Sequence, residues 1–136
     1  MKIPFKCDNV MVTSTYGTRT LNGKTAPHYG YDMVGVGSTD VVAVDGGVVA
    51  SSQIVTDKSN RTWEWGNYIC IKTDSGQYHY YCHLASRAVK KGQRVKAGDK
   101  LGVMGNTGYS FGVHLHFIIY ENGSHTNPLK YVKQPS

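Results

Sequence analysis

Apolar residues along this chain come in short runs bounded by glycine, asparagine and aspartate, without the three-to-four-residue spacing of a helix. Runs of this kind predict strands. We expect strands at residues 39–45, 48–55, 67–73, 77–84, 100–105 and 113–121. Helix signals are nearly absent, so the pattern predicts an all-β, compact antiparallel β-sheet domain.

Turn signals separate the expected strands. The glycine pair at 46–47 and the D-S-G stretch at 74–76 each stand between two strand-like runs, and both predict hairpins. The last run ends in the turn Asn-Gly at 122–123. Residues 89–99, V-K-K-G-Q-R-V-K-A-G-D, form a basic loop with two glycine turns.

The length of 136 residues, with 40% apolar and 18% charged residues, suits one folded domain over residues 1–136. No internal repeat or break in composition marks a second domain. Three cysteines, Cys7, Cys70 and Cys82, lack a metal-binding spacing, and their odd number argues against a full disulfide framework. We expect them to be free thiols.

The formal net charge of +6 favours polyanionic partners, among them nucleic acid, bacterial cell walls and membrane surfaces. A nucleic-acid site would show a basic patch interleaved with aromatic residues. The dense basic cluster lies instead within a glycine-rich loop, which is typical of a solvated turn. It consists of Lys90, Lys91, Arg94 and Lys96. We therefore expect no nucleic-acid partner.

Two histidines, His114 and His116, stand one residue apart in the strand-like stretch G-V-H-L-H-F. On a strand they project to one face, about 6.6 Å apart, whereas Leu115 and Phe117 project to the other. Buried imidazoles cost free energy unless each has a partner, and a bound metal would supply one. The same alternation places His79, Tyr81 and His83 on one face of their own strand.

Further metal ligands could come from His28 and Asp32, in the stretch P-H-Y-G-Y-D. Pro27 and Gly30 argue against a helix, and on a straight strand the two side chains would stand about 13 Å apart. A turn at Gly30 would bring them together. Nitrogen and carboxylate ligands suit zinc, and three protein ligands plus a water describe a catalytic zinc site.

Taken in order, H-x-x-x-D, Y-x-H-L and H-L-H-F resemble the lysostaphin/LytM-type zinc metallopeptidases, peptidase family M23, which cut bacterial peptidoglycan. Three longer stretches are also similar to this family: Y-G-T-R at 16–19, V-V-A-V-D-G-G-V-V at 41–49, and the basic loop with its following strand at 89–108. The resemblance covers about residues 14–128 and implies the family's compact antiparallel fold.

The resemblance also implies roles for five residues. His28, Asp32 and His116 would hold one Zn²⁺ per chain, and His83 and His114 would be catalytic histidines facing the bound water and the substrate. The chain departs from the family pattern beside the site. Ile118 stands where the family usually has glutamate, and S-F-G-V at 110–113 replaces S-T-G-P. We expect these departures to affect substrate preference.

The implied function is a zinc metalloendopeptidase that hydrolyses stem or cross-bridge peptide bonds of peptidoglycan, as a monomeric phage- or prophage-type endolysin catalytic domain. The alternative is a catalytically inactive relative that binds or scaffolds the cell wall. A degenerate copy should have lost one of the five site residues, and all five are present, which favours the enzyme. Which peptidoglycan bond is cut stays open.

Residues 1–12 lack the apolar core of a signal peptide, and no stretch approaches the roughly 20 apolar residues that span a bilayer. We expect a protein made in the cytoplasm, with no membrane partner, that reaches the wall after release through a holin-type pore. His79 and His125 have no counterpart in the family pattern, and we expect them to be structural or surface residues. Several aromatic residues could line a substrate groove: Tyr16, Tyr29, Tyr31, Trp63, Trp65 and Tyr109.

Overall fold

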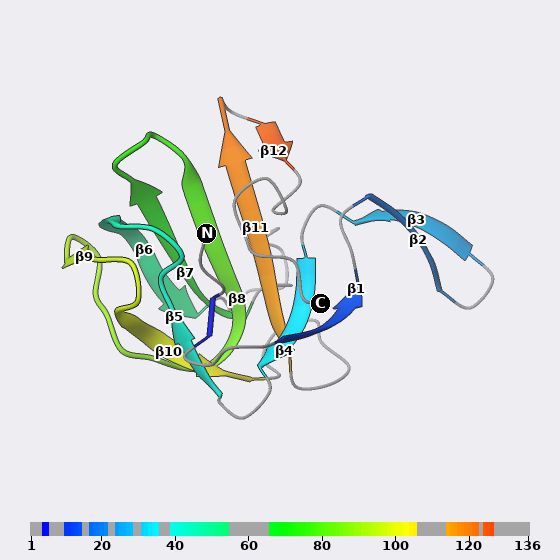
Figure 1. The fold of residues 1–136 in the computed structure, drawn as a ribbon, viewed down its shortest axis with the longest axis horizontal. Coiled ribbons are helices and arrows are strands. Elements are labelled where there is room, and N and C mark those ends of the chain that lie inside the picture. The colour runs from blue at the N-terminus through cyan, green and yellow to red at the C-terminus, as the bar shows by residue number, and fades with distance from the viewer. Residues whose placement is uncertain are drawn as a thin grey trace.

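The computed structural model of the chain is a sheet structure (Figure 1), described here for residues 4–5, 10–14, 17–21, 24–28, 31–35, 39–54, 66–105, 114–122 and 124–126. These residues contain twelve strands and no helix, and hence no helix able to cross a membrane, which confirms the predicted all-β class. The strands are β1 (Val10–Ser14), β2 (Gly17–Leu21), β3 (Lys24–His28), β4 (Tyr31–Gly35), β5 (Asp40–Val42), β6 (Gly47–Ile54), β7 (Asn67–Thr73), β8 (Tyr78–Arg87), β9 (Arg94–Val95), β10 (Lys100–Met104), β11 (Leu115–Glu121) and β12 (Ser124–Thr126).

One large antiparallel sheet organises the molecule. Its hydrogen-bonded order is β1-β4-β11-β8-β7-β6-β9, and β10 pairs with both β5 and β8, while β12 pairs with β11. Strands β2 and β3 form a separate two-stranded ribbon, which projects from the side of the sheet (Figure 1). The sheet therefore brings β4, β11 and β8, which are distant in sequence, next to one another.

Of the two predicted hairpins, one is confirmed and one is wrong. Strands β7 and β8 pair directly, and Gly76 at the turn has φ of +94°, a conformation that favours glycine. Strand β5, however, pairs with β10, and β6 pairs with β7 and β9. The glycine at 47 serves a close approach instead: a Cβ there would lie 2.1 Å from the backbone oxygen of Lys72 on β7.

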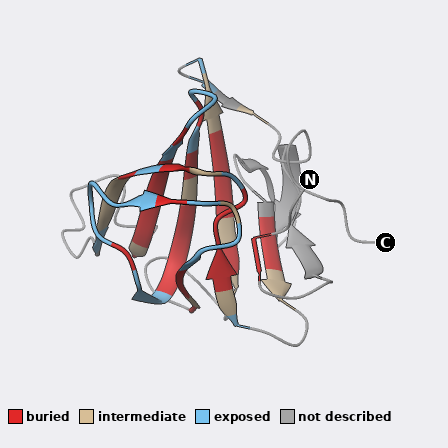
Figure 2. Cartoon of the chain, turned by 60° about the vertical axis from the view of Figure 1, so that its left-hand side comes forward, coloured by how far each residue is buried: buried red, intermediate tan, exposed pale blue. Residues whose placement is uncertain are grey.

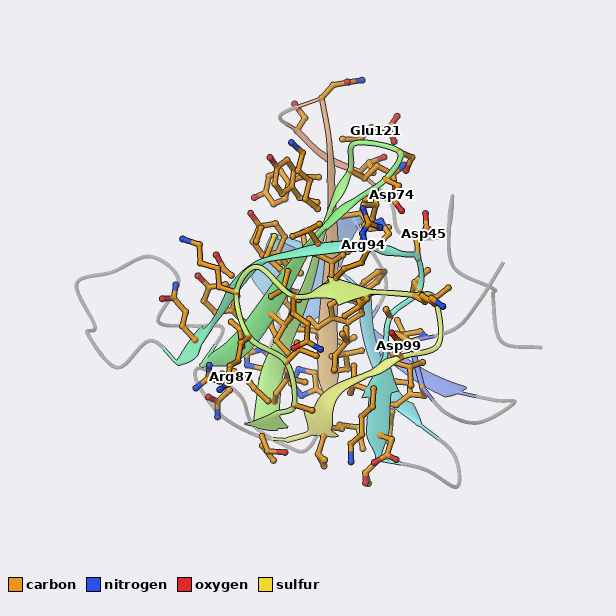
Figure 3. The ribbon with its side chains drawn as sticks, turned by 90° about the vertical axis from the view of Figure 1, so that its left-hand side faces the viewer. Asp45, Asp74, Arg87, Arg94, Asp99 and Glu121 are labelled. Carbon is orange, nitrogen blue, oxygen red and sulfur yellow. The ribbon has the colours of Figure 1, made fainter. Side chains whose placement is uncertain are left out.

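The basic loop has the two glycine turns that the sequence predicts, because Gly92 and Gly98 both have φ near +90°. Between these turns lies β9, a short strand that the sequence analysis did not predict. Arg94 of β9 forms an ion pair of 3.2 Å with Asp74, which belongs to the turn between β7 and β8 (Figure 3). This ion pair links the loop to the neighbouring hairpin.

The main core lies on one face of the sheet, where buried residues follow the central strands (Figure 2). Leu115 and Phe117 of β11 belong to it, as strand alternation predicts. The opposite face carries a smaller buried cluster of Tyr68, Cys82 and Ile118. We call this opposite face the site face, because β11 presents His116 there as well.

His79 of β8 is a buried core residue. Its side chain is 1% exposed, its ring packs edge-on against Phe117, and Nε2 lies 2.9 Å from Oε1 of Gln77. Its Nδ1 has no hydrogen-bond partner among the described residues. Burial lowers the pKa of His79 to about 4, and nearby Asp45 only partly offsets this effect. His79 is therefore neutral in the folded protein at neutral pH.

This buried neutral histidine predicts a loss of stability in mild acid. An unfolded chain protonates His79 below about pH 6.5, whereas the folded chain does so only near pH 4, so stability is complete above about pH 6.5 and falls toward pH 4. The expected contribution between pH 7 and 5 is about 2 kcal/mol. We expect His79→Gln to weaken this pH dependence in chemical denaturation with chelator present. An unchanged slope in the variant would contradict the assignment to His79.

Candidate active site

Asp32 and His116 form the centre of the candidate site. They face each other across the antiparallel pair of β4 and β11, although 84 residues separate them in sequence. Nδ1 of His116 donates a hydrogen bond of 2.6 Å to Oδ1 of Asp32. Both side chains are mostly buried, at 14% and 11% exposure, so solvent screens their interaction only weakly. A carboxylate oxygen and an imidazole nitrogen, both of a type that binds metal ions, thus lie next to each other.

His114 adjoins this pair on the same side. Its Nε2 lies 3.8 Å from Oδ1 of Asp32, and its backbone N–H donates to the carbonyl of Gly105 next to β10. The side chain of His114 is 17% exposed, so the imidazole has limited access to solvent. The strand alternation predicted that His114 and His116 share a face, and the structure agrees.

His83 of β8 completes the group. The centroid of its ring lies 4.8 Å from that of His114 and 5.7 Å from that of His116. The prediction that His83 shares a face with His79 and Tyr81 is wrong, because those two residues point into the main core. His83 points to the site face instead.

A β-bulge in β8 explains this reversal. Asn67 and Ile69 of β7, two positions apart, pair with Leu84 and Tyr81, which are three positions apart. The extra residue of β8 breaks the alternation, as bulges do. His83 has φ of +65°, in the left-handed region that few non-glycine residues occupy. The bulge therefore turns His83 toward the other histidines and returns Leu84 to the core.

The donor atoms suit zinc. Asp32 supplies a carboxylate oxygen and His116 an imidazole nitrogen, and both are frequent zinc ligands. In the present geometry these two atoms share a hydrogen bond. Within the described residues no group of three histidine, cysteine, aspartate or glutamate side chains is arranged to hold a metal. The third expected ligand is His28, the last residue of β3, and its side chain lies outside the described residues.

Other sequence expectations have mixed outcomes. The side chains of the six aromatic groove candidates and of His125 lie outside the described residues. Cys70 and Cys82 are free and buried, and Cys7 lies outside the description. Cys82 pairs directly with His116 across β8 and β11, a neighbour that the sequence did not predict. No sequence motif could predict this neighbour, because the register between two strands depends on both of them.

The antiparallel sheet brings a carboxylate and three histidines together on one face, and comparison with known proteins gives the family of the chain. The pattern of Peptidase family M23 matches residues 26–128. The chain belongs to this family. That result, together with the fold, confirms the lysostaphin/LytM-type resemblance.

Individual relatives agree with this assignment. The chain is 37% identical over 120 residues to peptidoglycan DD-endopeptidase ShyC of Vibrio cholerae, covering 86% of this chain and 26% of the relative. It is 34% identical over 116 residues to murein hydrolase activator NlpD of Escherichia coli, covering 85% and 28%. The chain therefore spans about a quarter of the length of these relatives.

Among solved structures, the fold is similar to the catalytic domain of the antimicrobial peptidase lysostaphin from Staphylococcus simulans. The TM-score is 0.75 at 30% identity, and the alignment covers 89% of this chain and 90% of that domain. The similarity thus extends over nearly the whole of a catalytic domain.

Proposed function

We propose that this chain is a zinc-dependent endopeptidase that hydrolyses peptide bonds of bacterial peptidoglycan. The observation that carries the proposal is the convergence of Asp32, His116, His114 and His83 on one face of the sheet in a member of family M23. Two of the relatives, ShyC and lysostaphin, bear names that describe peptidases, and the name of ShyC specifies peptidoglycan.

In this proposal Asp32, His116 and His28 hold the zinc ion. A bound zinc would lower the pKa of a coordinated water from its value in bulk solvent to about 7 and would polarise the scissile carbonyl. His83 and His114 stand beside the ligand pair, where one would take the proton of the attacking water and pass it to the amine nitrogen as the C–N bond breaks. The other donates a hydrogen bond to the negative charge that develops on the carbonyl oxygen. A histidine must do this proton transfer, because the chain has no H-E-x-x-H motif whose glutamate could act as the base.

Digestion of purified peptidoglycans with different bridge types tests this function. We expect mass spectrometry to show new peptide ends that a chelator abolishes and added zinc restores. The fragments would also name the bond. If folded, zinc-loaded protein releases nothing from any wall type, the endopeptidase proposal fails.

A second candidate function has a specific observation in its favour. NlpD is named as an activator of murein hydrolases, so similarity to it is compatible with a wall-binding or activating module. Such a module would sediment with intact peptidoglycan without cutting it, and His83→Asn would leave this binding unchanged. The presence of all five expected site residues favours the enzyme.

We also propose that the protein is made in the cytoplasm and acts on the wall after release, as a phage-type endolysin does. Two observations support this proposal. Peptidoglycan lies outside the membrane, and the net charge of +6 suits binding to an anionic wall. Expression in a sensitive host should leave cells intact until a pore-forming holin is co-expressed. Lysis without the holin would contradict this proposal.

A further inference from the structure

Cys82 occupies a position that nothing in the family motifs assigns. Strand β11 lies between β4 and β8, so His116 has Asp32 opposite it on one neighbouring strand and Cys82 opposite it on the other. Side chains opposed in this way have Cβ atoms about 4.5 to 5.5 Å apart. Cys82 is 0% exposed and packs with Tyr68 and Ile118 in the small cluster on the site face.

The thiol of Cys82 acts as an apolar filler in this environment. The neighbours of this side chain in the cluster are the side chains of Tyr68 and Ile118, and no group of three metal-ligand side chains, Cys82 included, forms within the described residues. Cys82 therefore contributes apolar volume at the position opposite His116 on the neighbouring strand.

We propose that Cys82 is a positioning residue for His116, whose packing holds the imidazole so that Nδ1 stays directed at Oδ1 of Asp32. The consequence for zinc and for hydrolysis rests on the function proposed above. Without Sγ, a cavity would open beside the ring on the side away from Asp32, and the ring could tilt into it. Loss of the outer-shell groups that orient metal ligands typically reduces metal affinity or activity about 10- to 100-fold, and we expect the loss of a packing contact to lie at the lower end of this range.

Cys82 also begins the bulge that directs His83. Cys82 and His83 together stand opposite the single residue Tyr68 of β7, and Cys82 is the member whose side chain is packed into the small cluster. Packing at this position therefore fixes the segment immediately before His83. Cys82 thus lies opposite a proposed ligand in the sheet and directly before a proposed catalytic histidine in the chain.

Cys70 provides a matched control. It is also a free thiol on the site face, it is 2% exposed, and burial raises its pKa to about 11. Its partner across β7 and β8 is Tyr80, and not a residue of the candidate site. Cys70→Ala and Cys82→Ala thus remove the same atom from two buried positions, and Cys70→Ala also removes a side-chain hydrogen bond with Tyr80. We expect similar losses in the free energy of unfolding, but a different effect on the site.

The experiment compares the parent chain with Cys82→Ala, Cys82→Ser and Cys70→Ala. The readouts are the zinc dissociation constant, kcat and KM on peptidoglycan fragments, and the imidazole ¹H–¹⁵N resonances of His116 in metal-free protein. We expect Cys82→Ala to weaken zinc binding about tenfold and to lower kcat with little change in KM. Its His116 resonances should also shift. Cys82→Ser keeps an atom at the γ position but is smaller and polar, so it should restore only part of each property.

The outcomes are decisive in each case. If Cys82→Ala and Cys70→Ala behave alike in zinc affinity and in the His116 resonances, Cys82 is only a core residue and the proposal is overturned. If the parent binds zinc but cuts no peptidoglycan, the endopeptidase function fails, and the zinc affinities still test Cys82. If the parent binds no zinc, the metal-free resonances alone decide whether Cys82 positions His116.

Discussion

Replacing His116 by alanine is expected to abolish both zinc binding and peptide hydrolysis. The imidazole nitrogen of His116 lies 2.6 Å from the carboxylate of Asp32 at the centre of the candidate site. The alanine substitution removes this nitrogen. A site of three protein ligands that loses one holds zinc far more weakly. The zinc content measured by elemental analysis should fall from about one ion per chain to near zero. Release of peptides should fall to the level of a protein-free sample.

The control for this experiment is His125→Ala, because His125 lies on β12 and has no place in the predicted site. It should keep zinc and activity at the level of the parent chain. Circular dichroism and denaturation should show that His116→Ala remains folded, since its imidazole lies on the site face and outside the main core. A His116→Ala protein that retains a full equivalent of zinc would remove His116 from the ligand set.

Replacing His83 is expected to separate catalysis from metal binding. His83 lies beside His114 and His116 but is not among the expected ligands, so its loss should leave zinc in place. Loss of general acid–base assistance typically lowers a rate about 10²- to 10⁴-fold. We expect this reduction in kcat for both His83→Ala and His83→Asn, with zinc content unchanged. Release of zinc by either variant would show that the division between ligands and catalytic histidines is wrong.

The two His83 variants should differ in stability because of the bulge. The backbone at His83 is left-handed, with φ of +65°. Asparagine adopts this conformation readily, whereas alanine in it lowers the free energy of unfolding by on the order of 1 kcal/mol. We therefore expect His83→Asn to unfold at higher denaturant concentration than His83→Ala, and His83→Gly to recover the loss. Equal stabilities would mean that the bulge relaxes once the imidazole is removed.

Local sequence patterns determined a large part of this fold. Alternation along 113–121 placed Leu115 and Phe117 in the core and His114 with His116 on the opposite face. Glycine signals marked the turns at Gly76, Gly92 and Gly98, all of which have positive φ. These features were predictable because they depend on a side chain's own strand or on a glycine's own backbone freedom.

Pairing between distant strands was decided only by the tertiary structure. The glycines after β5 suggested a hairpin with β6, yet β5 pairs with β10. The alternation along β8 suggested that His83 shares a face with Tyr81, yet an extra residue opposite Tyr68 turns His83 to the site face. A bulge is defined by the partner strand's register, so the pattern of a single strand does not contain it.

The sequence by itself determined which residue types are available for the site and, through family resemblance, the role expected of each. The tertiary structure decided that Asp32 and His116 share a hydrogen bond and that Cys82 lies opposite His116 on the other side. Both contacts arise because β11 lies between β4 and β8 in the sheet. Such neighbours come from long-range packing and register, which no short stretch of sequence specifies.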